Sequence, residues 1–218
     1  MWNHFWEPIQ LSITVTIAAS IVVIITGTLL GYLFARKAFK LKLLLETLFM
    51  LPLVLPPSVI GFLLIVLFGN QSIFGKWIKV IFGQSLIFTW YAAVIAASVV
   101  AFPLMFQTAK AGFQAIYKGI EEAAIDLGAN SKQVFFRVSL PLAKKALLAG
   151  CILSGTRALG EFGATLMFAG NIPGVTQTVP TAIYMAIDNG NMFLAWAWVI
   201  TMMGLSFILI YIVRSKEN

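Results

Sequence analysis

The chain has 218 residues, of which 60% are hydrophobic and 11% charged, and its formal net charge is +7. A soluble domain carries about 25% charged residues, so this composition excludes a chain that covers itself with polar surface and indicates lipid as its solvent. The basic residues flank apolar segments instead of forming one patch, which argues against nucleic-acid binding as the reason for the positive charge.

Apolar and polar segments alternate along the whole sequence, and a segment of about 20 apolar residues is long enough to cross a bilayer as a helix. We therefore expect an all-α integral membrane protein with about five transmembrane helices in a single domain, residues 1–218. The predicted spans are residues 11–34, 43–68, 86–106, 142–168 and 192–213.

The first predicted span carries small residues at helical spacing. Gly27 and Gly31 lie four residues apart and therefore on one face of a helix. Small residues let the backbones of two membrane helices approach closely. This face is expected to pack against a neighbouring helix.

Three prolines, Pro52, Pro56 and Pro57, interrupt the second predicted span. Each lacks a backbone N–H group and clashes with the preceding helical turn. In lipid the freed carbonyl groups need partners in neighbouring protein or water, so we expect a kinked helix that faces the bundle interior. Pro56 and Pro57 are candidates for lining a pathway or gate, with a purely structural kink as the alternative. Residues 69–84, rich in glycine, are predicted to form a loop.

The most polar stretch of the chain lies between the third and fourth predicted spans, at residues 110–141. Its pattern predicts two short helices with a turn between them. Gly128 can adopt positive φ and end the first helix, and Asn130 or Ser131 can cap the second. Pro141 then stops or starts a helix.

The fourth predicted span contains Arg157 and Glu161, which would lie on one face of a continuous helix. Charged residues at membrane depth are costly, and they usually pair with each other or face a cavity. Two interpretations stay open. The pair fixes helix packing, or Arg157 meets an anion in transit or takes part in gating. The region after this span is predicted to be a loop with one short helix near residues 181–187.

The distribution of basic residues predicts the orientation, because cytoplasmic loops of membrane proteins are enriched in Lys and Arg. Twelve of the fifteen basic residues fall on one side if the loop at residues 36–42 is inside. This arrangement puts the N-terminus outside and the C-terminus and the polar stretch in the cytoplasm. Lys76 and Lys79 are then the two basic residues outside, and Arg157 lies within a span.

A family resemblance is carried by the polar stretch. Glu122-Ala123-Ala124, followed by Gly128 and by Val138-Ser139-Leu140-Pro141, resembles the EAA loop of ABC-importer permeases, with Val138 where that family has Ile. The resemblance implies a cytoplasmic coupling helix that docks in a groove on a separate ATPase subunit, which binds ATP and Mg. The residues implied in this coupling are Glu121, Glu122, Ala123, Ala124, Asp126, Leu127, Gly128, Ala129, Phe135 and Pro141.

Two further regions of the sequence resemble particular groups of ABC-importer permeases. Leu51–Pro57 with Gly61 resembles the second core helix of molybdate and sulfate permeases, and Gly160–Thr165 with Thr178–Tyr184 resembles bacterial molybdate permeases. This implies a molybdate permease subunit in the prokaryotic plasma (inner) membrane. Its partners would be a second permease copy that completes the pore, the ATPase and an extracytoplasmic oxyanion-binding protein. Tungstate or sulfate is the alternative anion. The candidate pathway or gate residues are Pro56, Pro57, Arg157, Glu161 and Thr165.

Motifs of other functional classes are missing from the sequence. It has no Gly-rich loop ending in Lys-Ser or Lys-Thr, so we expect ATP to be bound by the partner and no cofactor by this chain. With one His and one Cys, a metal or thiol–histidine site is not expected, and the chain is interpreted as a non-catalytic subunit. An ATP-independent channel or secondary transporter would need ionisable residues spread through several spans. A membrane-embedded enzyme would need clustered acid, base or metal ligands near the end of a span.

Overall fold

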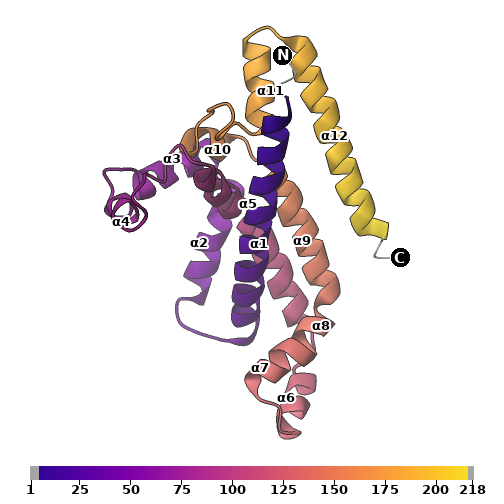
Figure 1. The fold of residues 1–218 in the computed structure, drawn as a ribbon. Helices are drawn as coiled ribbons and strands as arrows, with labels where there is room; N and C mark the ends of the chain where they lie inside the picture. The colour runs from indigo at the N-terminus through magenta and orange to yellow at the C-terminus, as the bar shows by residue number, and fades with distance from the viewer. Residues whose placement is uncertain (1–4, 216–218) are drawn as a thin grey trace.

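The computed structural model describes residues 5–215, and over these residues every regular element is a helix (Figure 1). The helices form an elongated bundle. We call the end formed by the short helices α6, α7 and α8, at the bottom of Figure 1, the basal end. Helix α11 lies at the opposite end. The predicted all-α fold class is confirmed.

The centre of the bundle is the pair α1 (Trp6–Arg36) and α5 (Trp90–Gln114), which pack along each other (Figure 1). A Cβ atom added at Gly27 would lie 2.7 Å from Cγ of Met105, and one added at Gly31 would lie 2.7 Å from Cβ of Ala109. The predicted close packing of this glycine face is therefore confirmed. In lipid, helices associate mainly through such van der Waals contact, because the surrounding acyl chains are as apolar as the side chains.

The second predicted span, residues 43–68, is two helices and not one kinked helix. α2 (Lys42–Val54) and α3 (Pro57–Phe68) meet at an angle of 119°. The break falls at Leu55 and Pro56, which have extended ψ values of 145° and 138°. A residue before proline disfavours the α conformation, and two consecutive prolines impose this restriction twice. The sequence predicted where the span is interrupted, but it predicted a kink in one helix where the structure has a bend of 119° between two helices.

The predicted loop at residues 69–84 contains a helix, α4 (Ile73–Phe82). The side chain of Ser72 accepts a hydrogen bond from the amide of Gly75 and caps its start, and Gly83 ends it with a φ of 71°. Both are ordinary helix boundary signals, an N-cap hydroxyl and a left-handed C-terminal glycine. The prediction of a loop was wrong because the glycines were interpreted as breakers and not as helix boundaries.

The polar stretch folds into α6 (Lys118–Asp126), α7 (Ser131–Val134), a π-helix at Phe135–Ser139 and α8 (Leu140–Leu142). The third predicted span continues as α5 to Gln114, so the helix runs into the region expected to be a loop.

The fourth predicted span, residues 142–168, is also divided. α9 (Lys144–Leu159) ends before Glu161, and α10 (Gly163–Phe168) starts anew after a three-residue break. α11 (Val179–Asp188) covers the predicted short helix at residues 181–187, and α12 (Met192–Ser215) follows it. α12 packs mainly against α11.

Length and composition qualify α1 and α5 to cross a membrane on their own. Two bent pairs raise the number to four if each pair counts as one span: α2 with α3, and Ser131–Leu142 with α9. Within the described part of α12, the apolar segment is Met192–Ile208. Five spans with the predicted bounds therefore remain a prediction.

The close approach of α1 to α5 gives a test of the packing. Gly31→Ala should destabilise the purified protein by about 1–3 kcal/mol, because the added methyl group overpacks a tight interface. Gly204→Ala in α12 is the matched control, since a Cβ there has no atom within 4 Å. The measurement is thermal unfolding in detergent, with a lower melting temperature expected only for Gly31→Ala. Equal melting temperatures would contradict the packing described here.

Candidate functional site

The turn at the basal end joins α6 to α7 as the sequence predicts. Gly128 has a φ of +90°, and its amide donates to the carbonyl of Ile125 at 2.8 Å. Asn130 caps α7: its side chain accepts from the amide of Gln133 at 3.0 Å, and the Gln133 side chain accepts from the amide of Asn130 at 2.9 Å. This reciprocal capping box fixes the direction in which α7 leaves the turn.

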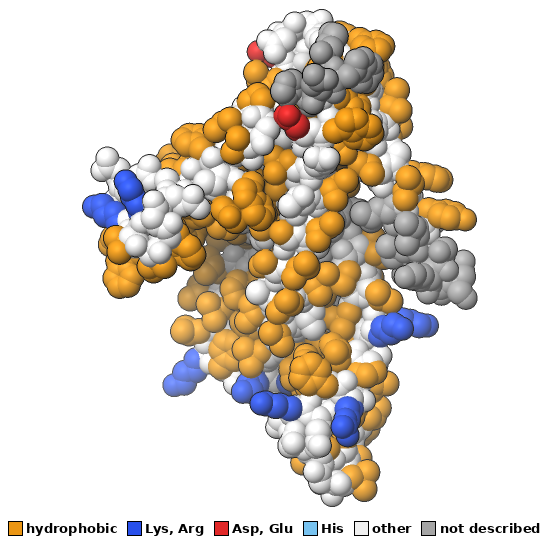
Figure 2. Space-filling view, in the orientation of Figure 1, with side chains coloured by type: hydrophobic (Ala, Val, Ile, Leu, Met, Phe, Trp, Pro, Cys, Tyr) orange, Lys and Arg blue, Asp and Glu red, His pale blue; other side chains and the backbone are white. Residues whose placement is uncertain are grey.

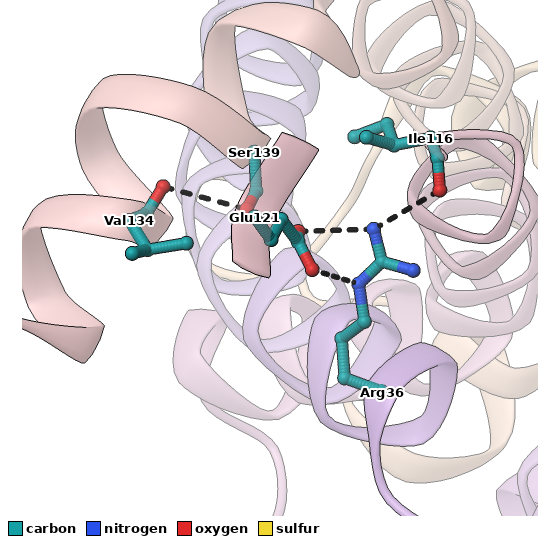
Figure 3. A network of polar contacts seen from close by, with 5 residues as sticks. All are labelled: Arg36, Ile116, Glu121, Val134 and Ser139. Carbon is teal, nitrogen blue, oxygen red and sulfur yellow. Dashed lines mark hydrogen bonds and ion pairs between the residues drawn. The ribbon is translucent and has the colours of Figure 1, made fainter. Parts of the chain in front are cut away.

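One carboxylate ties the basal end to the bundle. Arg36, the last residue of α1, reaches Glu121 of α6 with two nitrogen atoms (Figure 3). Nε lies 2.7 Å from Oε2, and Nη2 donates to Oε1 at 2.9 Å. Ser139 of the π-helix donates to the same Oε1 at 2.5 Å, and Arg36 also donates to the carbonyl of Ile116 at 3.4 Å. A bidentate, charge-assisted contact of this kind is both strong and directional.

This contact is shielded from solvent. Glu121 is 8% exposed and Ser139 is fully buried. Glu121 is one of the predicted coupling residues, but its side chain points into the chain and not outward (Figure 3). Phe135 also turns inward, with its ring 4.8 Å from Tyr32 and 6.2 Å from Phe113. A protein docking on the outside of the basal end would not reach either side chain in this arrangement.

The other predicted coupling residues are on or near the surface. Leu127 is 89% exposed at the C-terminal cap of α6, where the chain turns toward α7. Ala124 and Ala129 are half-buried and line a shallow pocket of about 380 Å³ beside it. The remaining residues of the set are all exposed: Glu122, Ala123, Asp126, Gly128 and Pro141. Together these side chains present a mixed apolar and acidic surface, which we call the basal surface.

Three large apolar side chains near the basal end were missed by the sequence reasoning. Tyr117 is 77% exposed, Ile125 54% and Phe136 61%. Each stands in the otherwise polar stretch, and that contrast was the available signal. Exposed apolar side chains gathered at one end of a molecule mark a surface for contact with another protein.

The π-helix at Phe135–Ser139 ends two residues before Pro141. In a regular helix the ring of this proline would clash with the carbonyl of Arg137, four residues earlier. The wider π turn falls at that carbonyl, and it also carries Ser139 to the Glu121 carboxylate. Such single π turns inside helices are frequent at functional sites.

The second candidate set, for a pathway or gate, comes from the two divided spans. These meet through their short second helices: a Cβ added at Gly163 would lie 3.0 Å from Cβ of Pro57, and one at Gly61 would lie 2.5 Å from Cβ of Met167. Pro56 and Pro57 are exposed at the break between α2 and α3. The structure therefore brings the proline break of one span to the start of α10 in the other.

Arg157 and Glu161 form the predicted ion pair, with Nη1 lying 2.7 Å from Oε2. They do not share a helix face, because α9 ends at Leu159 and Glu161 lies in the break. Glu161 is 3% exposed, and its Oε1 accepts from the amide of Ala164 at 2.8 Å. The carboxylate therefore holds the end of α9 and the first turn of α10 together.

Thr165 of α10 is buried beside this pair. With Glu161 and the hydroxyl groups of Ser12, Thr16 and Thr178 it lines a small space of about 10 Å³. That volume is at the lower limit for a single water molecule and far too small for an oxyanion. Thr165 therefore lies off any open route in this conformation. Over residues 5–215, no three His, Cys, Asp or Glu side chains gather in a way that could hold a metal ion.

The chain is similar in sequence to proteins named as molybdenum and sulfate transport permeases. The chain is 57% identical to a putative molybdenum transport system permease protein of Bacillus subtilis over 216 residues, covering 99% of this chain and 95% of the relative. It is 40% identical to the molybdenum transport system permease ModB of Escherichia coli over 184 residues, 84% of this chain and 80% of the relative. A sulfate transport system permease of E. coli is 30% identical over 226 residues, 100% of this chain and 81% of the relative.

Solved structures show the same fold at low identity. A bacterial ABC transporter for import of alginate aligns with a TM-score of 0.81 at 14% identity, covering 99% of this chain and 79% of the other. The MetNI methionine ABC transporter aligns with a TM-score of 0.68 at 18% identity, covering 98% and 94%. A family model described as the inner membrane component of binding-protein-dependent transport systems matches residues 27–215. The expected ABC-importer permease fold is therefore confirmed, and the chain belongs to this family of inner membrane transport components.

Proposed function

We propose that this chain is the permease subunit of an ATP-driven molybdate importer. The observation that carries the proposal is nearly full-length identity of 57% and 40% to proteins named as molybdenum transport permeases. The sulfate permease at 30% identity is a more distant relative, which favours molybdate over sulfate. Tungstate remains the alternative anion, because tetrahedral oxyanions of equal charge differ little in shape.

The basal surface is the proposed docking site for the ATPase subunit in the cytoplasm. Leu127 is exposed at the C-terminal cap of α6, so it can enter an apolar groove on the partner. The acidic side chains of Glu122 and Asp126 flank it and can pair with basic residues there. Closure of the ATPase dimer around ATP then moves the docked surface as one body.

The Arg36–Glu121 contact transmits this motion. It joins α6 directly to the end of α1, and α1 packs along α5 in the centre of the bundle. Displacement of the basal end is therefore delivered to the bundle through a rigid contact and not through the chain linkage alone. Rocking of the two permease copies against each other would expose the pathway alternately to each side of the membrane.

The remaining partners follow from the same proposal. A second copy of the chain completes the pore, and a binding protein delivers the anion on the opposite face. The positive-inside count supports an N-terminus outside and a C-terminus in the cytoplasm, because it collects most of the basic residues on the side of the basal end. The chain itself acts as a non-catalytic subunit, and the ATPase binds ATP and Mg.

We propose a structural role for Arg157 and Glu161. The carboxylate is buried and holds two helix ends, and the guanidinium opposite it is already paired. An arginine neutralised in this way attracts an anion in transit only weakly. The pair instead stabilises the break that brings α10 against α3.

The turn at Gly128 provides a test of coupling. Gly128→Val should leave ATP hydrolysis by the assembled importer poorly linked to uptake, because a β-branched residue strains a φ of +90° and displaces the basal surface. The measurements are ATPase stimulation by the loaded binding protein and anion uptake in reconstituted vesicles. Gly190→Val is the matched control, since Gly190 also has positive φ and open space around it. Wild-type values for both quantities in Gly128→Val would refute the role.

A second test addresses transmission from α6 to α1. Glu121→Gln should lower uptake per ATP hydrolysed by about tenfold, since coupling between sites is typically worth about 1–3 kcal/mol. The control is Glu46→Gln, which breaks an ion pair of 2.6 Å to Lys110 that joins α2 to α5 and has no partner in α6. An equal loss of coupling in the two variants would show that any ion pair serves and would contradict the assignment.

The third test separates the two roles of Arg157. Arg157→Leu should destabilise the protein by about 3–5 kcal/mol, because it leaves a buried carboxylate unpaired. Adding Glu161→Gln removes the charge but keeps an oxygen for the amide of Ala164, so the double variant should regain stability and uptake. Melting temperature and labelled-molybdate uptake are the two measurements. A stable double variant without uptake would show that Arg157 acts on the anion.

A further inference from the structure

Helix α4 separates basic from apolar side chains more cleanly than its neighbours. Lys76 and Lys79 share one face, and Trp77 and Ile81 share the other at helical spacing. Among residues 5–215 little covers the apolar face: Trp77 and Ile81 are each 68% exposed, and Val80 is 85% exposed. A partner that complements this helix has apolar groups against Trp77 and Ile81 and negative charges against Lys76 and Lys79.

The orientation of α4 is fixed by the rest of the fold. Gly75, buried on α4, lies against the backbone of Gly69 with no room for a Cβ atom. Ser72 caps the start of the helix, and its hydroxyl also donates to the carbonyl of Gly69 at 2.8 Å. The helix is therefore held against the end of α3 and does not swing freely.

The position of α4 indicates how it would meet a surrounding bilayer. It projects sideways from the bundle, near α3 and far from the basal end (Figure 1). In the space-filling view, the basic side chains of this projection lie on its edge away from the basal end, and apolar side chains lie on the side toward it (Figure 2). A bilayer surrounding the bundle would thus meet the apolar side, and its surface would meet the lysines.

We propose that α4 lies flat in the outer headgroup layer of the membrane as a lipid anchor, with Trp77 and Ile81 among the acyl chains and Lys76 and Lys79 at anionic phospholipid headgroups. A short amphipathic helix with lysines on one face and a tryptophan on the other has the features of an interfacial helix. The assignment of α4 to the outer side rests on the proposed orientation of the permease, with its N-terminus outside and its C-terminus in the cytoplasm.

Charge complementarity favours lipid as the occupant. No acidic residue occurs between Gly69 and Thr89, so the two lysines have no counterion within their own segment. They are also the two basic residues that the positive-inside count leaves outside. Anionic lipid phosphates supply the missing charge on the surface of the membrane.

A pocket beneath the helix fits the same occupant. It has a volume of about 400 Å³ and lies between α3, α4 and α5. Its lining is almost entirely apolar and includes Phe68, Ile78, Phe82 and Ile95. An acyl chain can enter this pocket while its headgroup stays level with the lysines. A second copy of the chain, the rival occupant, would need an acidic surface to match them.

The test compares the two faces of α4 in the assembled importer. In a Cys151→Ser background, Ile81→Cys and Lys79→Cys are each labelled with a fluorophore in vesicles of phosphatidylethanolamine and phosphatidylglycerol. Lipids brominated on the acyl chain should quench the Ile81 label at least about twofold more than the Lys79 label, because an interfacial helix buries its apolar face by about 5–10 Å. Equal quenching, or a disulfide between two copies at Ile81→Cys without quenching, would overturn the proposal.

The headgroup contact has its own measurement. Lys76→Gln with Lys79→Gln should weaken phosphatidylglycerol binding, read by native mass spectrometry, by about fivefold per lysine, and the Lys→Arg pair should retain it. Unchanged binding would overturn the headgroup assignment. A membrane-impermeant thiol reagent on Lys79→Cys reports the side separately. Suppose that the reagent reacts only from the ATPase side while the fluorophore at Ile81→Cys is still quenched by lipid. That result would contradict the proposed orientation with α4 outside, and it would support the contact between α4 and lipid.

Discussion

The buried ion pair between Arg36 and Glu121 is the contact on which the organisation of the molecule depends. It joins the polar basal end to the end of α1, in a bundle whose buried core is largely apolar. A membrane bundle offers few directional contacts, since lipid competes for every apolar surface. One shielded carboxylate with an arginine and a serine hydroxyl therefore sets the position of the basal surface more strictly than packing could.

The two divided spans obey a second constraint. A helix interrupted in lipid leaves backbone groups without partners, so breaks are tolerated only where protein covers them. Here the break at Leu55–Pro56 and the break before α10 are placed against each other through Gly61 and Gly163. Glu161 supplies an acceptor for one free amide of the first turn of α10, that of Ala164. Each break thus lies against the other divided span, although Pro56 and Pro57 remain exposed in the single chain.

Much of the site could be predicted from local patterns. Gly128 was correctly placed at the turn, and Asn130 was one of the two residues expected to cap α7, because the conformations that these residues favour depend on their own side chains. The directions of Glu121 and Phe135 could not be predicted, because helix periodicity alone does not say which face the neighbours cover. α4 was missed for a different reason: glycines at both ends of a short helix resemble those of a loop.

The sequence by itself determined the fold class, the break near Pro56 and Pro57 and the turn at Gly128, because composition, prolines and turn residues act locally. Only the tertiary structure decided the 119° bend between α2 and α3, the burial of Glu121, and the position of Glu161 beyond the end of α9. The physical reason is distance along the chain: Arg36 and Glu121 are separated by 85 residues, and their contact exists only once the bundle has brought them together.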